Sequence, residues 1–375
     1  MDTPLYHFGP TAQILLLGGL ITAVPLIGLA WRFRHDPPAR RASRLIWLML
    51  FLTFDLVLFG SFTRLTDSGL GCPDWPGCYG QASPLGARNH IQAAQDVMPT
   101  GPVTHSKAWI EMIHRYLATG VGGLILVWCA LAWWRRRRGD PNARAGWATF
   151  TLFWVCLQGA FGAWTVTMKL FPAIVTLHLL GGLILLALLA HQAAMASVPE
   201  PSGVAVPLTD LRLPAWLGWA GVALLVQIAL GGWVSTNYAV LACDTFPTCQ
   251  GSFWPQMDMA AGFEWWRPLG HTASGELLSF EALTAIHYVH RLAAYVVIAL
   301  LIHVAWRLNA AGMRGHARAL AALVILQFLT GLSNVVLGWP LPAAVLHTGG
   351  AAALLVVLVL ARSRAISPLH STHRS

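Results

Sequence analysis

Long apolar segments dominate the hydrophobic pattern of this chain. A helix needs about 20 mostly apolar residues to cross the roughly 30 Å hydrocarbon core of a bilayer. Segments of that kind lie near residues 12–31, 45–63, 108–134, 147–167, 173–195, 214–234, 282–306, 318–338 and 343–361. The pattern therefore predicts an all-α integral membrane protein that crosses the bilayer nine times.

The composition is typical of a membrane protein. Of the 375 residues, 56% are hydrophobic and only 10% are charged, whereas about a quarter of the residues in a soluble domain are charged. The longest polar connections are 64–107 and 235–281, and their glycine and proline residues argue against a further soluble domain.

The net charge of +9 is concentrated in arginine-rich segments between the spans. These segments are 32–44, 134–144, 307–318 and the tail from 362. With nine spans they all fall on one side of the membrane, which the positive-inside rule makes cytoplasmic. We therefore interpret the charge as a topology signal and not as a nucleic-acid surface. We expect a bacterial inner-membrane protein with a periplasmic N-terminus and a cytoplasmic C-terminus.

Two parts of the sequence resemble each other. The segment FGSFTRLTDSGLGCPDWPGCYG at 59–80 aligns with LGGWVSTNYAVLACDTFPTCQG at 230–251, at an offset of 171 residues. Matching histidine segments follow in the same order, 110–118 with 286–294 and 172–182 with 342–352. The repeat predicts two pseudo-symmetric four-helix bundles that share one orientation in the membrane.

The repeat also predicts the domain organisation. The two units are expected at 45–195 and 214–362, joined by a cytoplasmic linker at 196–213. Residues 1–44 hold an extra transmembrane helix and a basic cytoplasmic loop, and residues 363–375 form a cytoplasmic tail.

Four of the six cysteines lie in the two outward loops. The space outside the bacterial inner membrane is oxidising, so the simplest assignment is two local disulfides, Cys72–Cys78 and Cys243–Cys249. A zinc site is the alternative. Zinc prefers four ligands in a tetrahedron, however, and neither loop supplies a second ligand pair nearby.

Four histidines lie at a similar depth in the predicted spans: His114, His178, His290 and His347. At 1.5 Å per residue they lie roughly 5–10 Å below the outer surface. Ionisable residues inside spans are costly and point to a function. Two imidazoles that face each other across a bundle can ligate a haem iron. We therefore expect a haem site in each unit, and ligand pairs that cross between units stay open.

The two units differ beside these histidines. Glu111 precedes His114 by three residues, whereas His287 holds that position before His290. Positions i and i+3 share a helix face, and a carboxylate beside a bound haem can act as a general acid or base. We therefore expect the catalytic site in the unit of Glu111 and keep His287 as a secondary candidate.

Three arginines are candidates for binding haem propionates. Arg115 and Arg291 directly follow the histidines of the second helices, and Arg64 ends the first helix of its unit. A guanidinium binds a carboxylate with two parallel hydrogen bonds. An interfacial anchor is the alternative for Arg64.

These features resemble one protein family. They are TRLTDSGLGCPDWPGCYG at 63–80, the Glu111-x-x-His114-Arg115 and His287-x-x-His290-Arg291 helices, and the histidines that follow the entering prolines. Over about 45–362 the chain is similar to the haem A synthase family. The resemblance implies an oxidoreductase that converts haem O to haem A for cytochrome oxidase, by oxidising the C8 methyl group to a formyl group. The extra first helix departs from the simplest eight-helix pattern of the family.

The resemblance also implies roles for the site residues. His114 and His178 would attend the substrate haem O, with Glu111 catalytic, while His290 and His347 would ligate a resident haem b. The implied partners are haem O synthase, an unknown electron acceptor and the lipid bilayer.

Two other functions stay open. A di-haem membrane cytochrome b that exchanges electrons with quinone would use the same histidine pairs, and a haem carrier would hand over haem at its outward loops. The restriction of Glu111 to one unit, together with TRLTDSGLGCPDWP, favours the enzyme.

Overall fold

The computed structural model of the chain describes residues 5–140, 143–196 and 211–366. Within these ranges it is all-helical, with a few isolated β-bridges and no strand. The elements are α1 (Thr11–Arg32), α2 (Pro38–Leu65), α3 (Arg88–Val97), α4 (His105–Arg137), α5 (Ala145–Thr167), α6 (Pro172–Ala196), α7 (Leu213–Thr236), η1 (Ala239–Leu241), α8 (Met259–Gly262), α9 (Phe280–Ala310), α10 (Arg314–Val336) and α11 (Leu341–Ile366). Most of the predicted linker at 196–213 and of the predicted tail at 363–375 lies outside the described residues.

Nine helices in the described part of the chain are long and apolar enough to cross a membrane. They are α1, α2, α4, α5, α6, α7, α9, α10 and α11. The prediction of an all-α membrane protein with nine spans is confirmed. The predicted pseudo-symmetry and the domain boundaries stay predictions.

Several helices extend beyond the predicted apolar segments because polar residues begin them. Thr104 caps α4, since its hydroxyl accepts a hydrogen bond from Lys107 N at 3.3 Å. Ser279 caps α9 in the same way through Ala282 N at 3.2 Å. Such side chains satisfy an amide that has no partner in the first helical turn. Pro38 begins α2, where its fixed φ suits a first helical position.

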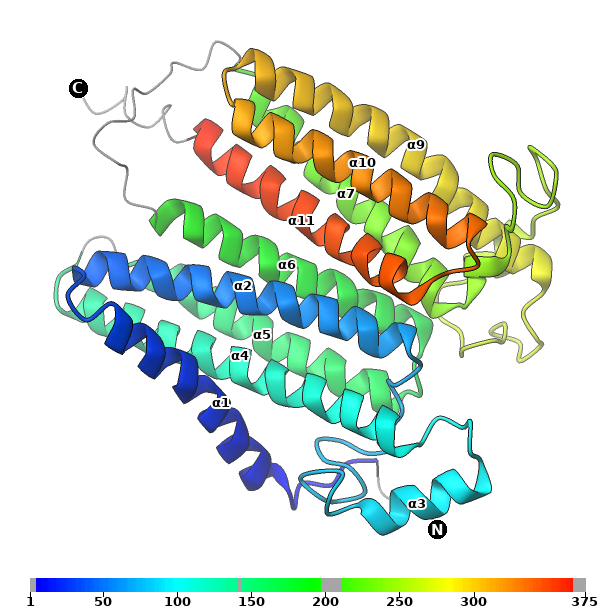
Figure 1. Cartoon of the computed structure of the whole chain (residues 1–375), viewed down its shortest axis with the longest axis horizontal. Coiled ribbons are helices and arrows are strands. Elements are labelled where there is room, and N and C mark those ends of the chain that lie inside the picture. Colours follow the sequence, from blue (N-terminus) through cyan, green and yellow to red (C-terminus); the bar gives the residue numbers. More distant parts are fainter. Residues whose placement is uncertain (1–4, 141–142, 197–210, 367–375) are drawn as a thin grey trace. The chain divides into compact units, whose positions relative to one another are not determined.

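The chain divides into two compact units, with the boundary between Leu189 and Ala190 in α6. In the first unit, α4 packs against α1, α2 and α5, as Figure 1 shows, and α3 lies near the end of α4 that begins at His105. Helix α6 joins this unit at α5, where Trp154 Nε1 donates to Gly181 O at 2.8 Å. It also reaches α2, because Gly182 lies against Val57.

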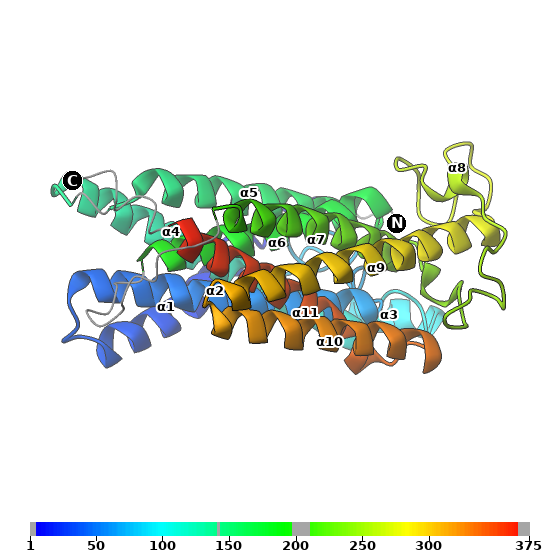
Figure 2. The same ribbon diagram turned by 90° about the horizontal axis from the view of Figure 1, so that it is seen from above.

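In the second unit, α7 packs against α9 and α11, and α10 packs between α9 and α11. Figure 2 shows α9 running from this bundle into the loop region that contains α8. Trp233 Nε1 of α7 donates to Gly262 O at 2.9 Å, which fastens that loop region to the helices.

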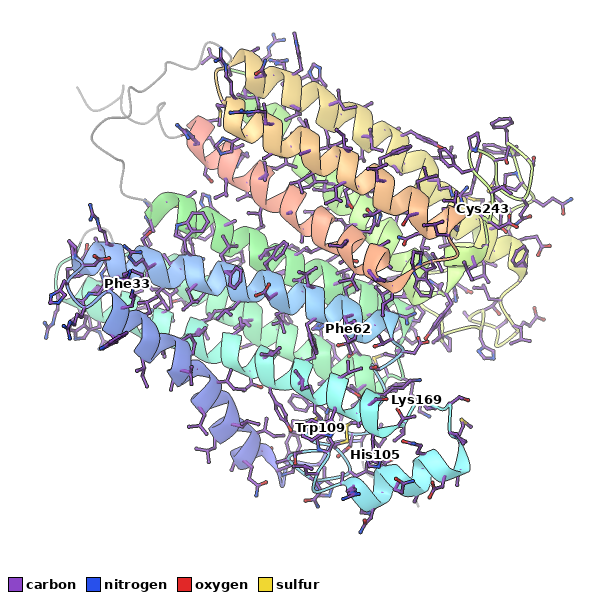
Figure 3. The ribbon with its side chains drawn as sticks, viewed as in Figure 1. Phe33, Phe62, His105, Trp109, Lys169 and Cys243 are labelled. Carbon is purple, nitrogen blue, oxygen red and sulfur yellow. A yellow bond between two sulfur atoms is a disulfide. The ribbon has the colours of Figure 1, made fainter. Side chains whose placement is uncertain are left out.

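The connections at 66–104 and 237–279 contain short helices that the sequence pattern did not predict. Helix α3 is mostly polar and buries only Ile91, so it has no long apolar segment. In Figure 3, Phe62, His105 and Lys169 lie at one end of the first unit, and Phe33 lies at the other end. The first cysteine loop therefore belongs to the end opposite Phe33.

Gly181 allows the close approach of α5 and α6, which gives a stability prediction. A Cβ atom there would collide with Gln158, whereas a Cβ atom at Gly159 of α5 would meet nothing within 4 Å. Because the collision is with the end of the Gln158 side chain, we expect Gly181→Val to lower the free energy of unfolding by about 1 kcal/mol, the lower end of the effect of overpacking. Thermal unfolding in detergent measures the change. Gly159→Val is the control, and an equal loss in both variants would contradict the packing argument.

Candidate haem-binding and catalytic site

The first unit brings His114 of α4 and His178 of α6 together. The two imidazoles are close enough that a positive charge on one would repel a positive charge on the other. Each lies against a glycine of a neighbouring helix. A Cβ at Gly60 of α2 would lie 2.9 Å from His114 Nε2, and one at Gly162 of α5 would lie 3.5 Å from His178 Cε1. Four helices therefore meet at the level of this histidine pair.

The second unit brings His290 of α9 and His347 of α11 together in the same manner. A Cβ at Gly231 of α7 would lie 2.9 Å from His290 Cε1. One at Gly331 of α10 would lie 3.1 Å from His347 Cε1. Each unit, described by itself, thus holds two neighbouring imidazoles, each of which lies beside a glycine of another helix.

The Nδ1 atoms distinguish the two pairs. In the second unit, Thr330 Oγ1 lies 3.0 Å from His347 Nδ1. The hydroxyl donates its own hydrogen to Leu326 O at 2.8 Å, so its oxygen can accept a hydrogen bond from the Nδ1–H group. The amide of Gln227 lies 3.0 Å from His290 Nδ1. Its Oε1 is buried without a hydrogen-bond partner among the described residues. The Nε2 of the same amide donates to His290 O at 3.1 Å, so this amide contacts both the ring and the backbone of His290.

In the first unit the Nδ1 of His178 is buried and has no hydrogen-bond partner within the described ranges. A histidine that binds a metal almost always donates its other ring N–H to an acceptor, which fixes the ring. The second unit meets this requirement at His347, where Thr330 Oγ1 is the acceptor. The first unit does not meet it at His178.

Glu111 lies beside the first histidine pair and is only 4% exposed. Its Oε2 accepts a hydrogen bond from Cys72 N at 2.8 Å, and its Oε1 pairs with Arg115 Nη2 at 2.5 Å. A buried carboxylate is costly unless it is paired and hydrogen-bonded, and both oxygens meet that condition. The sequence spacing thus places a fixed carboxylate one helical turn from His114.

Arg115 also holds the first disulfide loop (residues 72–78). Its Nη1 donates to the carbonyl oxygens of Asp74, Pro76 and Gly77 at 2.9, 3.2 and 2.5 Å. In the second unit, Arg291 donates to three carbonyls of the second disulfide loop (residues 243–249). These are Thr245 O at 2.7 Å, Thr248 O at 3.1 Å and Cys243 O at 2.6 Å. Both arginines therefore fasten a loop to the helix that carries the candidate iron ligand.

His287 also takes part in this second network. Its Nδ1 lies 3.0 Å from Ala239 O, and its Nε2 accepts from Arg291 Nε at 3.2 Å. Both ring nitrogens therefore have protein partners. Through them His287 connects α9 to the backbone of η1 and to Arg291. Arg64 pairs with Asp67 at 3.1 Å at the end of α2. Propionate binding by Arg64, Arg115 and Arg291 stays a prediction.

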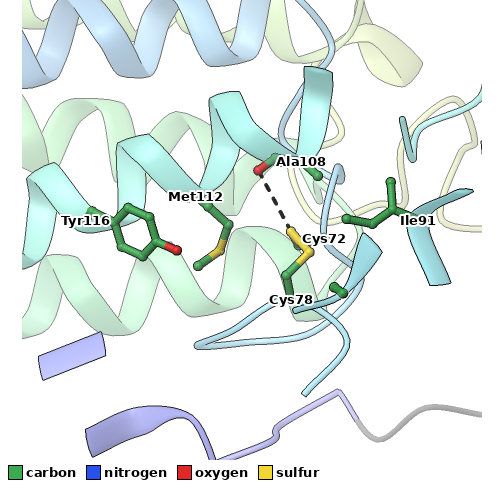
Figure 4. Packing of buried hydrophobic residues seen from close by; sticks show 7 residues of the cluster. Cys72, Cys78, Ile91, Ala108, Met112 and Tyr116 are labelled. Atoms are coloured by element: carbon green, nitrogen blue, oxygen red, sulfur yellow. Dashed lines mark hydrogen bonds between the residues drawn. A yellow bond between two sulfur atoms is a disulfide. The ribbon is translucent and has the colours of Figure 1, made fainter. Parts of the chain in front are cut away.

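Both expected disulfides are present, Cys72–Cys78 and Cys243–Cys249, and all four cysteines are buried. The first pair packs with Ile91, Ala108 and Met112, and Cys72 Sγ points toward Ala108 O at 4.0 Å (Figure 4). The second disulfide forms a smaller cluster with Tyr288 and Met257. Each disulfide is thus part of the packing against the histidine-bearing helix.

Asp74 organises the first disulfide loop, a role that the sequence analysis missed. Its carboxylate is buried and accepts hydrogen bonds from Tyr79 N at 2.6 Å and Gly80 N at 2.7 Å. Burial, together with the nearby Asp74 charge, raises the pKa of the Tyr79 hydroxyl. The Pro-Asp-Trp-Pro sequence was a possible signal, since aspartate often binds the backbone of its own turn. Gln227 and Thr330 were also missed.

The residues fit a haem better than a bare metal ion. No group of three or more His, Cys, Asp or Glu side chains that could hold an ion occurs in the described ranges. A haem iron needs only two axial protein ligands, because the porphyrin supplies the others. The paired imidazoles and the glycines beside them are compatible with that ligand set.

The model of a family described as cytochrome oxidase assembly protein, COX15-CtaA, matches residues 43–359. A Heme A synthase from Shewanella oneidensis is 39% identical over 321 residues, which cover 84% of this chain and 95% of that relative. A Heme A synthase from Bradyrhizobium sp. is 30% identical over 358 residues, with coverages of 88% and 94%.

The arginine network predicts a large effect on stability. Arg115→Ala would leave the buried carboxylate of Glu111 without its cation and remove the donor to three loop carbonyls. We expect the free energy of unfolding to fall by about 3–5 kcal/mol, as when one member of a buried ion pair is removed. Thermal unfolding in detergent measures this. Arg88→Ala, at an exposed position of α3, is the control. A similar small change in both variants would contradict the proposed role of Arg115 in holding Glu111 and the first disulfide loop.

Proposed function

This chain belongs to the haem A synthase family of cytochrome oxidase assembly proteins, and on that premise we propose that it oxidises the C8 methyl group of haem O to a formyl group. The product, haem A, would serve cytochrome oxidase. The observation that carries the proposal is the buried Glu111 carboxylate, held by Cys72 N and Arg115 beside the His114–His178 pair. The corresponding position of the other unit is a histidine.

The first unit is proposed as the substrate site. Glu111 supplies an acid–base group there, and the Nδ1 of His178 has no acceptor among the described residues to hold its ring. A substrate must enter and leave, so a less firmly fixed ligand pair suits it. His114 and His178 would attend the iron of haem O.

The second unit is proposed to hold a resident haem b through His290 and His347. Thr330 and Gln227 lie at hydrogen-bond distance from the two Nδ1 atoms, so both rings have a neighbour that can fix their orientation. A bound haem b supplies one-electron transfer. Arg291 keeps the second disulfide loop against α9 and so helps to exclude water from this unit.

Glu111 is the group proposed to move a proton during oxidation of the methyl group. Its two oxygens have fixed partners, and the Arg115 guanidinium stays next to it as a permanent charge. A positioned carboxylate of this kind contributes typically 10²–10⁴-fold to a rate. His114 lies three residues further along the same helix, so one rigid element positions both groups.

The membrane arrangement is part of the proposal. Nine apolar helices make the protein multi-pass, and the arginine-rich connections favour a bacterial inner membrane with the disulfide loops on the periplasmic side. Haem O synthase would deliver the substrate from the membrane, and an electron acceptor of unknown identity would reoxidise the protein.

Glu111→Gln tests the catalytic role. The amide keeps the size of the carboxylate but cannot take up a proton, so we expect haem O conversion to fall at least about a hundredfold while bound haem is retained. The measurement is co-expression with a source of haem O, extraction in acid acetone and chromatography of the haems. Glu281→Gln, at an exposed position of α9, is the matched control. If the wild-type chain yields only haem B, a cytochrome b or a haem carrier replaces the proposal.

The resident haem gives a separate prediction. His290→Ala and His347→Ala should each abolish the absorbance of a haem with two histidine ligands in the second unit, because an imidazole ligand is lost. His303→Ala is the control, since His303 lies on α9 like His290 but packs between Trp216 and Trp306. The absorbance spectrum of purified protein decides the matter. A spectrum unchanged in both His290 and His347 variants contradicts this site.

A further inference from the structure

Helix α1 and the residues before it lie outside the family match, which begins at residue 43. The preceding segment, residues 5–10, runs along the first disulfide loop. We call this segment the strap. Nothing in the chemistry proposed above requires α1 or the strap, so their contacts need a separate explanation.

The strap pairs with the loop through the backbone. His7 N donates to Trp75 O at 3.0 Å, and Trp75 N donates to Leu5 O at 3.0 Å, which makes a parallel β-bridge between Tyr6 and Trp75. These two bonds satisfy both polar backbone groups of Trp75. They lie at the middle of the disulfide loop, between Cys72 and Cys78.

Side chains of the strap add to this pairing. The His7 ring lies 3.2 Å from the position of a Cβ at Gly80, and Pro10 lies 2.8 Å from that of a Cβ at Gly77. Glycine at these two positions lets the strap approach the loop closely. Tyr6 also reaches α5, where its hydroxyl lies 3.3 Å from Thr167 Oγ1.

Helix α1 holds the strap in place by packing against α4. A Cβ at Gly18 would collide with Thr119, and one at Gly120 would lie 2.6 Å from Ile21. Thr22 Oγ1 donates to Gly120 O at 3.1 Å across the same contact. These small residues bring the two backbones together, which is how helices commonly associate in membranes.

The loop that the strap holds is bonded to Glu111. Cys72 N, at the start of the loop, donates to Glu111 Oε2 at 2.8 Å. The second disulfide loop has no equivalent strap: within the described residues, no backbone hydrogen bond is made to Phe246, which corresponds to Trp75 at the offset of 171. The strap is thus a feature of the unit that carries the carboxylate.

We propose that α1 and the strap keep the first disulfide loop closed over α4 and thereby position Glu111 through Cys72 N. The effect on Glu111 rests on the proposed function, whereas the effect on the loop does not. In this role Leu5 and His7 are positioning residues, since they act on the carboxylate through the loop.

The test uses the full chain and its two disulfides. His7→Pro removes the N–H that bonds to Trp75 O and suits an extended segment, whereas His7→Ala keeps the N–H. With dithiothreitol as the probe, thiol labelling and mass spectrometry give the reduction rate of each disulfide. We expect Cys72–Cys78 to be reduced about tenfold faster in His7→Pro, because buried disulfides react through local opening and a bond that closes the loop is lost. Cys243–Cys249 in the same molecule should not change.

A second pair of variants acts through the helix. Gly18→Leu should separate α1 from α4 and accelerate reduction of Cys72–Cys78, whereas Gly19→Leu should not, since a Cβ at Gly19 meets nothing within 4 Å. Unchanged rates in both His7→Pro and Gly18→Leu would overturn the strap, whatever the activity toward haem O.

Conversion of haem O tests the link to Glu111. We expect His7→Pro to lower the rate of haem O conversion while the amount of bound haem stays the same. His7→Ala should convert haem O at the wild-type rate. Faster reduction with an unchanged conversion rate would overturn the positioning of Glu111. A wild-type chain without conversion would overturn the proposed function, and the reduction rates would still decide the strap.

Discussion

The interior position of the four imidazoles depends on glycine. Gly60, Gly162, Gly231 and Gly331 each face one of the histidines, and a Cβ at any of them would lie between 2.9 and 3.5 Å from an imidazole atom. At Gly60, Gly231 and Gly331 a side chain would therefore press on the ring and turn it, whereas the 3.5 Å at Gly162 is an ordinary contact. Polar rings are costly inside a membrane bundle. On the proposed function, bonds from these imidazoles to haem iron would offset this cost.

The second constraint is the arginine that follows each histidine of α4 and α9. Arg115 and Arg291 lie beside the disulfide loops and donate to carbonyl oxygens at corresponding loop positions, Asp74 with Thr245 and Gly77 with Thr248. A buried carbonyl without a donor is unfavourable, and a guanidinium offers several donors in one plane. One side chain can therefore fasten a whole loop. The disulfide closes the loop, and the arginine attaches it to the helix.

Much of the fold could be predicted from the sequence, because membrane spans are read from apolar length alone. The histidine pairs also followed from their depth in the spans. The partners of the arginines could not be predicted, because Arg115 contacts residues up to 41 positions away and the path of the loop decides which carbonyls face it. Helix α3 was missed because it buries a single residue. The pairing of the strap with Trp75 involves only backbone atoms, so no residue type signals it.

The residue one helical turn before His114 and before His290 gives the two proposed haem sites different surroundings. In the first unit the Arg115 cation is compensated by the Glu111 carboxylate. In the second unit the residue in that place is His287, which accepts a hydrogen bond from Arg291 on Nε2 and faces a carbonyl with Nδ1, as a neutral imidazole does. The other donors of Arg291 bind carbonyl oxygens of the second disulfide loop, and the nearest carboxylate charge that acts on it is that of Asp244. On the proposed function, the hydrogen-bonded network of His287 and Arg291 suits a haem that stays bound, whereas the Glu111 carboxylate suits a haem that reacts.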